Sequence, residues 1–330
     1  MANAIASSAL VASLTLGPVL PALALECSKA STAEDKAICS YPQAVAADDA
    51  MVKAYQALAA RLADADKKML LQSQRAWLKT RANSCADKTG AAQSQCLREV
   101  TEQRRAFLQG LPVEGPGSGG KLAPVFIQKP VRKGDYALDV AVAKYMPPTT
   151  PAEKLFNGEV DKLLKDVPPR KDEELERDVT YSYDLHLSVV YASPQFISAH
   201  VDSYLFSGGA HGSSETSNIN IDATDAKILD FGGVFASTSE PKILAECMRQ
   251  ILAQKAERMG DEKIEGDELK QLRASVGESL RNLGTWSFSP RGASVVFDPD
   301  TIGAHAEGAY ACEFEAGFLK PLVKTGFALP

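Results

Sequence analysis

The sequence is poor in the residues that most often build metal centres. Its 330 residues include only four histidines, and these are scattered along the chain. Its six cysteines never occur as C-x-x-C, a spacing that many zinc sites use. This pattern argues against a zinc site, and we expect the protein to bind no metal and no other cofactor.

Long apolar runs are missing beyond residue 25, so we expect no integral membrane segment in the mature chain. The first 24 residues differ from the rest because they carry no charged side chain. They include the apolar segment Ala9–Leu23 and end in Ala22-Leu23-Ala24, which has the small-x-small pattern of a cleavage site. We predict that residues 1–24 form a secretory signal peptide and that the mature protein is periplasmic or secreted.

Negative charge outweighs positive charge in the larger part of the chain. Residues 131–330 contain 21 Lys and Arg against 31 Asp and Glu, a net charge of −10. Residues 25–130 contain 15 Lys and Arg against 11 Asp and Glu, a net charge of +4. The acidic part disfavours nucleic acid as a partner and suits a basic one, although acidity can also serve solubility alone.

Apolar side chains recur at three- and four-residue steps between Asp48 and Leu108, which indicates helices. A short break at Asp64–Asp66 and a second one near Cys85 divide this stretch into three. Three helices with short connections predict a small antiparallel bundle over residues 25–110. A bundle of this size has a limited core, so covalent staples would supplement it.

The cysteines form two groups, four before residue 100 and two after residue 240, which suggests two separately stapled domains. An even number in an exported chain favours disulfides. The ends of a helical hairpin meet, which favours Cys39–Cys85 and leaves Cys27–Cys96, although four cysteines allow three pairings. Cys247, on an expected helix, and Cys312, on an expected strand, favour a third bridge, with two free buried thiols as the alternative.

One motif in the second expected helix is specific enough to suggest a family. Gln74-Arg75-Ala76-Trp77-Leu78-x-x-Arg81, with the flanking Cys27-x-x-Ala30, Ile38-Cys39, Cys85 and Cys96-Leu97, resembles the LprI-type lysozyme-inhibitor family over residues 27–108. The resemblance implies a small exported helical domain. A tryptophan in such a position is more often a core residue than a contact to a partner, and we expect the same of Trp77. Gln74 and Arg81 share its helical face, where Arg81 could bridge the hairpin or meet a partner.

Two prolines and four glycines in LPVEGPGSGGK, residues 111–121, predict a linker, and we place a flexible linker over residues 111–129. Beyond it, alternating apolar residues predict strands, which are separated by helices. The expected strands are Tyr136–Val142, Thr180–Val190, Phe196–Phe206, Ser214–Ile221, Thr285–Ser289, Ala293–Phe297 and Ala309–Glu315. The expected helices are Ala152–Val167, Pro241–Met259, Asp267–Leu283 and Phe318–Val323. Residues 130–330 therefore predict an α+β domain with a mostly antiparallel sheet.

The pentapeptide Gly208-Gly209-Ala210-His211-Gly212 lies between two of these strands. Its glycines permit the positive φ angles that a tight or bulged hairpin requires. No cysteine or carboxylate stands near His211 at metal-binding spacing. A Ser-His-Asp arrangement with Ser207 is conceivable, but aspartates are too abundant for this to be informative. We interpret Gly208, Gly209 and His211 as turn residues.

The context of this hairpin suggests a second family. Ser207-Gly208-Gly209-Ala210-His211 and the later segments Asn218–Asp222, Phe288-Ser289 and Phe297–Gly308 resemble the RsiV-type lysozyme-sensing domain over about residues 130–325. That domain also accompanies peptidoglycan deacetylases. The resemblance implies that the loop Phe297–Gly308 reaches a lysozyme cleft, and its polar residues Asp298, Asp300, His305 and Glu307 are the expected binding residues. The alternative is a plain strand connection that contains glycines.

Both resemblances favour an exported binding protein that inhibits or senses a lysozyme-like, glycan-cleaving enzyme by occluding its cleft. We expect no catalytic residues and no enzymatic activity. A second hypothesis is a peptidoglycan-binding accessory module, or an enzyme acting on cell-wall glycan with two carboxylates that the sequence does not single out. A third, the sensory ectodomain of a membrane regulator, is disfavoured because no apolar span follows the signal segment.

Overall fold

The computed structural model describes residues 25–86, 88–169, 174–260 and 263–330. The expected signal segment, residues 1–24, lies outside the described residues. The predicted fold class is confirmed: disulfide-stapled helices precede an α+β region whose sheets are mostly antiparallel. Within the described part of the chain, no helix combines the length and apolar character needed to cross a membrane.

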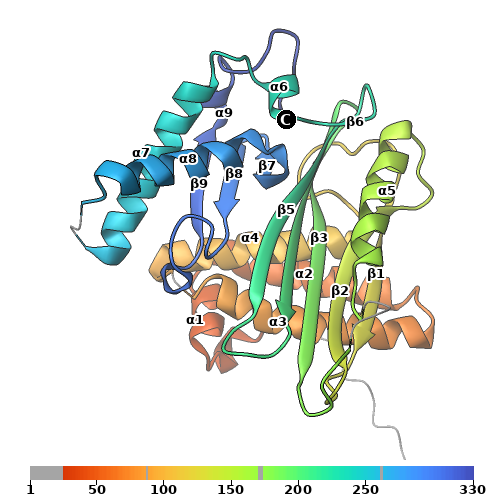
Figure 1. Ribbon diagram of the computed structural model, residues 1–330. Coiled ribbons are helices and arrows are strands. Elements are labelled where there is room, and N and C mark those ends of the chain that lie inside the picture. The colour runs from red at the N-terminus through yellow and green to blue at the C-terminus, as the bar shows by residue number, and fades with distance from the viewer. Residues whose placement is uncertain (1–24, 87, 170–173, 261–262) are drawn as a thin grey trace, which may run out of the picture.

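The regular elements in the described part of residues 25–110 are helices (Figure 1). They are the short 3₁₀ helix η1 (Cys27–Lys29) and the α-helices α1 (Ala33–Cys39), α2 (Pro42–Ala59), α3 (Asp64–Ser84) and α4 (Gly90–Gln109). The expected break at Asp64–Asp66 was wrong by a few residues: the chain leaves the helix at 60–63, and Asp64 already begins α3. Acidic side chains in a first turn face the positive end of the helix dipole, which accounts for this position.

The central element is a six-stranded sheet with strand order β1-β2-β3-β4-β5-β6. Its strands are β1 (Leu122–Lys129), β2 (Tyr136–Tyr145), β3 (Tyr181–Ala192), β4 (Phe196–Phe206), β5 (Ser213–Asp222) and β6 (Lys227–Ile228). Only β2 and β3 pair in parallel among the described strands. A parallel pair needs a crossover, which α5 (Pro151–Lys165) supplies. Thr150 and Glu153 cap the start of α5 reciprocally.

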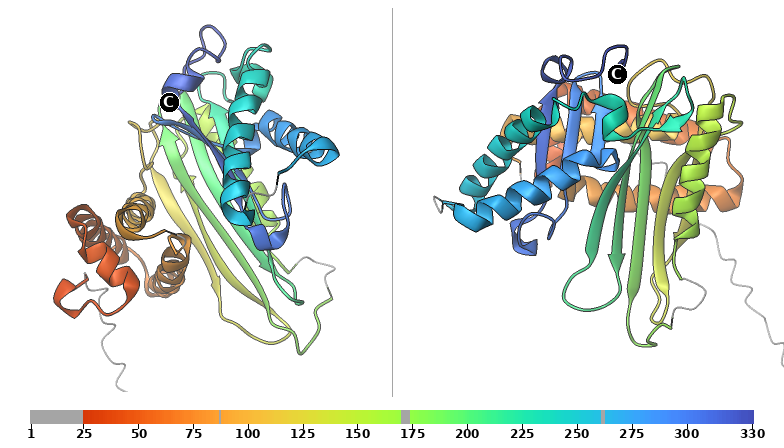
Figure 2. Two further views of the ribbon diagram at one scale, coloured as in Figure 1. Left: turned by 90° about the vertical axis from the view of Figure 1, so that its left-hand side faces the viewer. Right: turned by 45° about the horizontal axis from the view of Figure 1, so that its top comes forward.

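A smaller sheet, β7-β8-β9, follows and is antiparallel throughout. Its strands are β7 (Trp286–Ser289), β8 (Gly292–Phe297) and β9 (Tyr310–Glu315). The helices of this region are α6 (Phe231–Val234), α7 (Glu240–Met259), α8 (Gly266–Arg281) and α9 (Ala316–Leu319), with 3₁₀ turns η2 (Leu283–Thr285) and η3 (His305–Glu307). Figure 2 shows the N-terminal helices on one side of the large sheet and α7 and α8 on the other.

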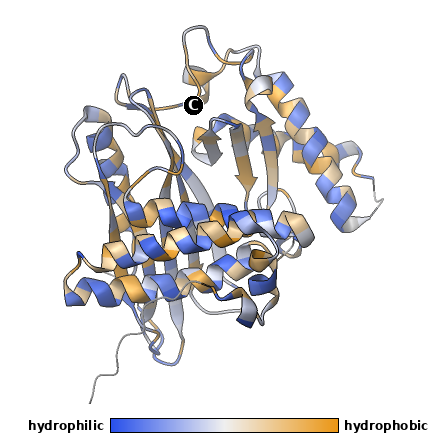
Figure 3. Ribbon diagram, turned by 180° about the vertical axis from the view of Figure 1, so that it is seen from behind, coloured by the Kyte–Doolittle hydropathy of each residue, from blue (hydrophilic) through white to orange (hydrophobic). Residues whose placement is uncertain are grey.

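The N-terminal helices and the large sheet share one hydrophobic core. Leu58 of α2, Leu70 of α3 and Phe107 of α4 belong to the same buried cluster as Val140 and Leu187 of the sheet. The ring of Phe107 also meets Phe126 of β1 edge to face, with 5.9 Å between centroids. In Figure 3 the helices run across the strands of this sheet. The two regions are therefore packed together.

The expected flexible linker over residues 111–129 was wrong. Its second half is strand β1, and its first half is fixed to the sheet by hydrogen bonds from the Val113 and Glu114 amides to the Val189 and Val190 carbonyls. Gly115 lies so close to Ala192 that a Cβ there would collide with that carbonyl oxygen. The glycines thus allow close backbone approach, which sequence composition does not distinguish from mobility.

The expected pairing of the first four cysteines was also wrong. The structure joins Cys27 to Cys39 and Cys85 to Cys96, with Cα–Cα distances of 5.5 and 5.9 Å. Helix α1 was not expected from the sequence, and it carries Cys39 to η1 instead of to the α2–α3 hairpin. The expected bridge between α7 and β9, Cys247–Cys312, is present.

Damage to the helices should also be felt in the small sheet, because the helices share a core with the large sheet and Phe196 of the large sheet packs on Phe288 of the small one. Phe107 is 7% exposed, and we expect Phe107→Ala to lower the unfolding free energy by about 3–5 kcal/mol through cavity formation. Fluorescence of the buried Trp286, recorded in a Trp77→Phe background, should report the loss. The exposed Leu111 provides the control, because Leu111→Ala removes an apolar side chain without opening a cavity. If the unfolding midpoint reported by Trp286 is the same with and without Phe107→Ala, the helices and the small sheet unfold independently.

Candidate binding cleft and loop

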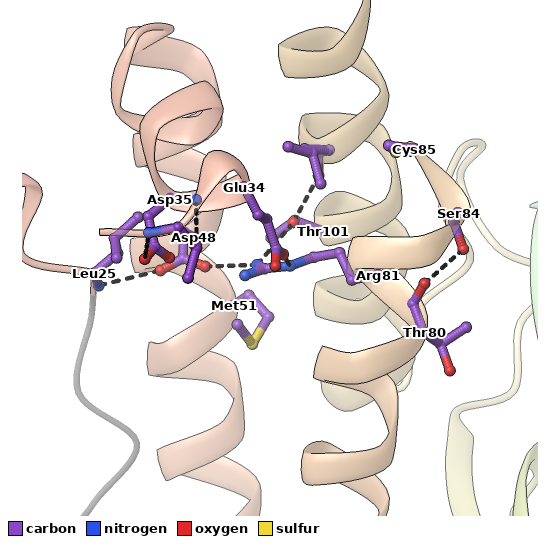
Figure 4. A network of polar contacts seen from close by, with 12 residues as sticks. Leu25, Glu34, Asp35, Asp48, Met51, Thr80, Arg81, Ser84, Cys85 and Thr101 are labelled. Carbon is purple, nitrogen blue, oxygen red and sulfur yellow. Dashed lines mark hydrogen bonds and ion pairs between the residues drawn. The ribbon is translucent and has the colours of Figure 1, made fainter. Parts of the chain in front are cut away.

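Arg81 is the centre of the N-terminal helices. Its side chain is buried, and its Nε and Nη1 atoms donate to Glu34 Oε1 of α1 at 2.6 Å and Asp48 Oδ1 of α2 at 2.9 Å. Nη1 also reaches Thr101 Oγ1 of α4 at 3.4 Å. One guanidinium on α3 therefore connects all four helices, as Figure 4 shows. Of its two expected roles, Arg81 has the bridging one.

Gln74 and Trp77 lie on the same helical face but have different surroundings. Gln74 is buried and accepts a hydrogen bond from Arg104 Nε at 3.0 Å, while Arg104 Nη2 donates to Ser73 Oγ at 3.1 Å. The half-buried ring of Trp77 has the Arg81 and Arg104 guanidinium carbons 5.0 and 5.7 Å from its centroid. Gln74 and Arg81 thus build the fold, and Trp77 keeps part of its ring open.

The Arg81 network predicts a large loss of stability when the cation is removed. We expect Arg81→Met to lower the unfolding free energy by about 3–5 kcal/mol, because buried Asp48 then lacks its cation. The exposed Arg75 on the same helix is the matched control, and Arg75→Met should change stability by less than about 0.5 kcal/mol. Denaturant titration measures both variants. Equal midpoints for the two would contradict the central role of Arg81.

The structure brings together the two loops that the sequence analysis singled out. Gly208, Gly209 and His211 form the tip of the β4–β5 hairpin, and both of these glycines have positive φ angles of 96° and 93°. The imidazole of His211 stacks on that of His305 with 3.8 Å between centroids. His305 Nδ1 in turn lies 2.9 Å from Asp300 Oδ2. The hairpin tip and the β8–β9 loop, residues 297–308, therefore form one surface.

Asp298 fixes the base of the β8–β9 loop. Its carboxylate accepts hydrogen bonds from the Thr216 amide and hydroxyl on β5, both at 2.7 Å. Glu307 fixes the other end by accepting from Lys255 Nζ at 2.7 Å and from the Tyr310 hydroxyl at 2.6 Å. These hydrogen bonds lower the pKa of Glu307 to about 2. Of the four expected binding residues, Asp298 and Glu307 are thus occupied within the chain.

Asp300 and His305 differ from the other two because their side chains are 62% and 41% exposed. Asp300 has a φ of 71°, a left-handed conformation that is uncommon for a residue other than glycine. The loop therefore holds an exposed carboxylate and an exposed imidazole at its tip, supported at both ends. This arrangement suits a contact surface, and it supplies no nucleophile with a general base.

A groove that the sequence analysis missed lies between the N-terminal helices, the large sheet and the small sheet. It consists of three adjoining depressions, all of which include Asp202 of β4. We call the three depressions together the groove. Its lining residues come from three parts of the structure. They include Trp77, Thr80, Ser84, Gln103 and Arg104 of α3 and α4; Asp184, His186, Ser188, His200, Asp202 and Thr216 of the large sheet; and Ser287, Arg291, Glu313 and Glu315 of the small sheet.

The floor of the groove is a row of histidine–carboxylate pairs. His186 Nε2 lies 3.1 Å from Asp139 Oδ2, and His200 Nε2 lies 3.0 Å from Asp202 Oδ1. Register places Asp139 opposite Asp184, and His186 opposite Asp202, so all face the same side of the sheet. The signal was available as alternating charged residues in β3 and β4, but it indicates a polar face without saying what covers it.

Burial and hydrogen bonding set the charges of these groups apart. Burial opposes ionisation of Asp139 and Asp202, yet hydrogen bonds from His186 and His200 lower the pKa of each carboxyl overall. Burial alone would lower the pKa of His200, but its bonds to Asp202 and Asn218 raise it. Burial, together with the charge of Asp139, raises the pKa of Asp184 to about 6. Asp184 is therefore the carboxyl of this row whose pKa is raised.

The raised pKa of Asp184 predicts a pH-dependent stability. Its contribution is present in full below about pH 4, the unfolded value, and is lost as the pH rises through about 6. We expect Asp184→Asn to raise the unfolding free energy at pH 8 by roughly 1–2 kcal/mol and to have little effect near pH 4. The exposed Asp178 serves as control through Asp178→Asn. A gain that is independent of pH would contradict the assignment.

Comparison with known proteins gives partial matches to two families. Residues 27–108 match the family described as "Lysozyme inhibitor LprI", and residues 121–214 match the one described as "Deacetylase PdaC". Each match covers less than a third of the chain. No curated protein matches the chain. The expected LprI-type resemblance is thus confirmed for the N-terminal region, while the RsiV-type resemblance stays a prediction.

Two solved structures of the DUF3298 family are similar to part of this chain. One, from Pseudomonas aeruginosa, is 13% identical and covers 62% of this chain and 95% of its own, with a TM-score of 0.44. The other, from Bacteroides fragilis, is 10% identical and covers 63% and 95%, with a TM-score of 0.42. At these values the likeness carries no argument about function. The chain is therefore similar to a lysozyme-inhibitor family in its helices and to a deacetylase-named family in the first strands of its large sheet.

Proposed function

We propose that this protein is an exported binding protein that inhibits or senses a lysozyme-like, glycan-cleaving enzyme. The observation that carries the proposal is the match of residues 27–108 to a family described as a lysozyme inhibitor. Three disulfides within the described residues are in keeping with an oxidising compartment outside the cytoplasm. The role proposed is binding, and no catalytic residues are assigned.

The contact surface that we propose is the β8–β9 loop with the tip of the β4–β5 hairpin. Asp300 and His305 project from this loop, and His211 supports it by stacking. Thr80 and Ser84 of α3 border the same opening as Thr216, whose amide and hydroxyl bind Asp298 at the base of the loop. A partner that enters here would meet both the LprI-like helices and the loop.

Charge supports a basic partner. Residues 131–330 have a net charge of −10, and exposed Glu215 lies on β5, one of the strands that lead to the loop. Complementary charge mainly accelerates encounter and gives salt dependence, whereas packed groups supply most of the affinity. In this proposal the loop occludes the glycan-binding cleft of the enzyme, and the acidic surface steers the two proteins together.

Binding of a basic lysozyme to the chain from residue 25 onward tests the proposal. We expect saturable binding that weakens as salt rises, and we expect Asp300→Ala combined with His305→Ala to weaken it by about 3- to 10-fold. Surface plasmon resonance gives the rate constants. Glu278→Ala, an exposed charge on α8, is the control and should leave the affinity unchanged. The absence of saturation at about 100 μM lysozyme, a concentration that would detect even weak complexes, would refute the proposal for this class of enzyme.

A further inference from the structure

The groove carries an inference that does not depend on lysozyme binding, although Thr80, Ser84 and Thr216 border both surfaces. We propose that it binds a neutral oligosaccharide, with Trp77 as the stacking platform and with Gln103, Ser188 and Asp202 as the principal hydrogen-bonding groups. The wall formed by α3 and α4, the floor formed by β3 and β4, and the far end formed by the small sheet all contribute to the site. None of the exposed loop residues discussed above takes part.

The first support is an aromatic ring that is only partly covered. Trp77 lines the groove and is half-buried, with Arg81 and Arg104 at its ring. An indole presents a flat apolar face with a polar edge, and such rings are favoured where a ligand is partly apolar and partly wet. A pyranose ring has this character, because its C–H groups form an apolar face while its hydroxyls point outward. Ala141 and Leu187 add apolar surface beside Trp77.

The second support is the mixture of charges, which selects a neutral ligand. A small anion near Arg104 would meet Asp202 in the same depression, and a cation near Glu313 would meet Arg291. Carboxylates accept hydrogen bonds, guanidinium groups donate them, and amides and hydroxyls do both. A polyhydroxylated neutral chain can use both kinds of group at once. Neither an anionic nor a cationic chain could do so without repulsion at one end.

The third support is the presence of groups already held in place. Arg104 is buried, and its hydrogen bonds go to the neutral groups of Gln74 and Ser73, so its positive charge remains uncompensated by a direct ion pair among the described residues. Burial lowers the pKa of Arg104 to about 10, which still leaves it a cation at neutral pH. His186 is oriented by Asp139, and His200 by Asp202. Polar groups fixed in this way lose little conformational entropy when a ligand binds.

The shape of the groove indicates a chain of several sugar units. Asp202 belongs to all three depressions, Ser188 and Gln103 join the first to the second, and His186 joins the first to the third. The groove thus continues from Glu315 at the small sheet, past Trp77, to Tyr204 near the hairpin. A monosaccharide would fill only one part, so we infer that a linear oligosaccharide is the ligand.

The protein itself provides the signal for a test. Of its two tryptophans, Trp286 has 0% exposure, so a change in tryptophan fluorescence on adding sugar should come from Trp77. The probes are the uncharged tetramers chitotetraose and maltotetraose, added to the chain from residue 25 onward. We expect a saturable change with at least one of them and no such change in Trp77→Phe. Calorimetry of the same titrations gives the affinity without relying on fluorescence.

Groove variants separate binding in the groove from binding elsewhere. We expect Gln103→Ala combined with Asp202→Asn to lower the affinity by at least about 10-fold, the loss expected when ligand hydroxyls lose hydrogen bonds to a charged group and an amide. The control, Gln72→Ala, removes an exposed amide from α3 outside the groove and should bind as the parent does. Thermal unfolding of each variant shows that the fold is kept.

Three results would overturn the inference. They are the absence of saturation with both tetramers at about 10 mM, which lies beyond the range of useful affinity; binding that survives the Gln103 and Asp202 substitutions; and preference for a sulfated tetramer over the neutral ones. The lysozyme test is independent, since Asp300→Ala with His305→Ala should leave sugar binding unchanged. Either proposal can therefore fail while the other stands.

Discussion

The position of Arg104 is the constraint on which the arrangement of helices and sheet depends. Its guanidinium is buried where α3, α4 and the large sheet meet, and burying a cation is unfavourable unless polar groups surround it. Gln74 and Ser73 supply hydrogen bonds, and the carboxylate of Asp139 supplies a favourable field. The LprI-like motif and the acidic floor of the sheet are thus complementary halves of one environment. Phe107, beside the same guanidinium, adds the apolar part.

This environment explains why the groove exists where it does. The helices cover the apolar part of the sheet around Phe126 and Ala141, and the small sheet covers Phe196 through Phe288. Between these two contacts, β3 and β4 carry histidines and carboxylates. Covering these groups with the helices or the small sheet would cost free energy, because the charged groups would lose their water. The polar strip is therefore left open to solvent. Its openness follows from side-chain chemistry on two strands and requires no special loop.

The sequence predicted the elements well and their mutual packing poorly. Strong periodicity located α5, α7, α8, β2–β5 and the last three strands to within a few residues, and it indicated the helical stretch that contains α2–α4. The parallel pairing of β2 with β3 and the strand β1 were missed. An apolar run that follows a glycine-rich segment resembles a linker in sequence, and the direction of pairing depends on where α5 crosses the sheet. The cysteine pairing failed because one short helix, α1, redirects Cys39. These are long-range consequences that local composition does not encode.

The candidate sites show the same division. The GGAH hairpin and the β8–β9 loop were identified separately, and the stacking of His211 on His305 joins them. Two of the four loop residues nevertheless bind within the chain, which a pattern of acidic residues could not show. The groove escaped notice altogether because its residues come from helices, strands and the small sheet. No stretch of sequence contains more than a part of it.

The common core of the helices and the large sheet has a consequence for how such a chain can evolve. A module that folds alone can be exchanged between genes by recombination with little effect on its neighbours. Here Phe107 packs on Phe126, and the end of α4 at Gly110 approaches Leu122 so closely that a Cβ would not fit. A helical segment imported from another protein would need matching changes in β1. Substitutions on the two sides of this contact should therefore co-vary. The junction between α4 and β1 is thus a barrier to exchange of the helical segment by recombination.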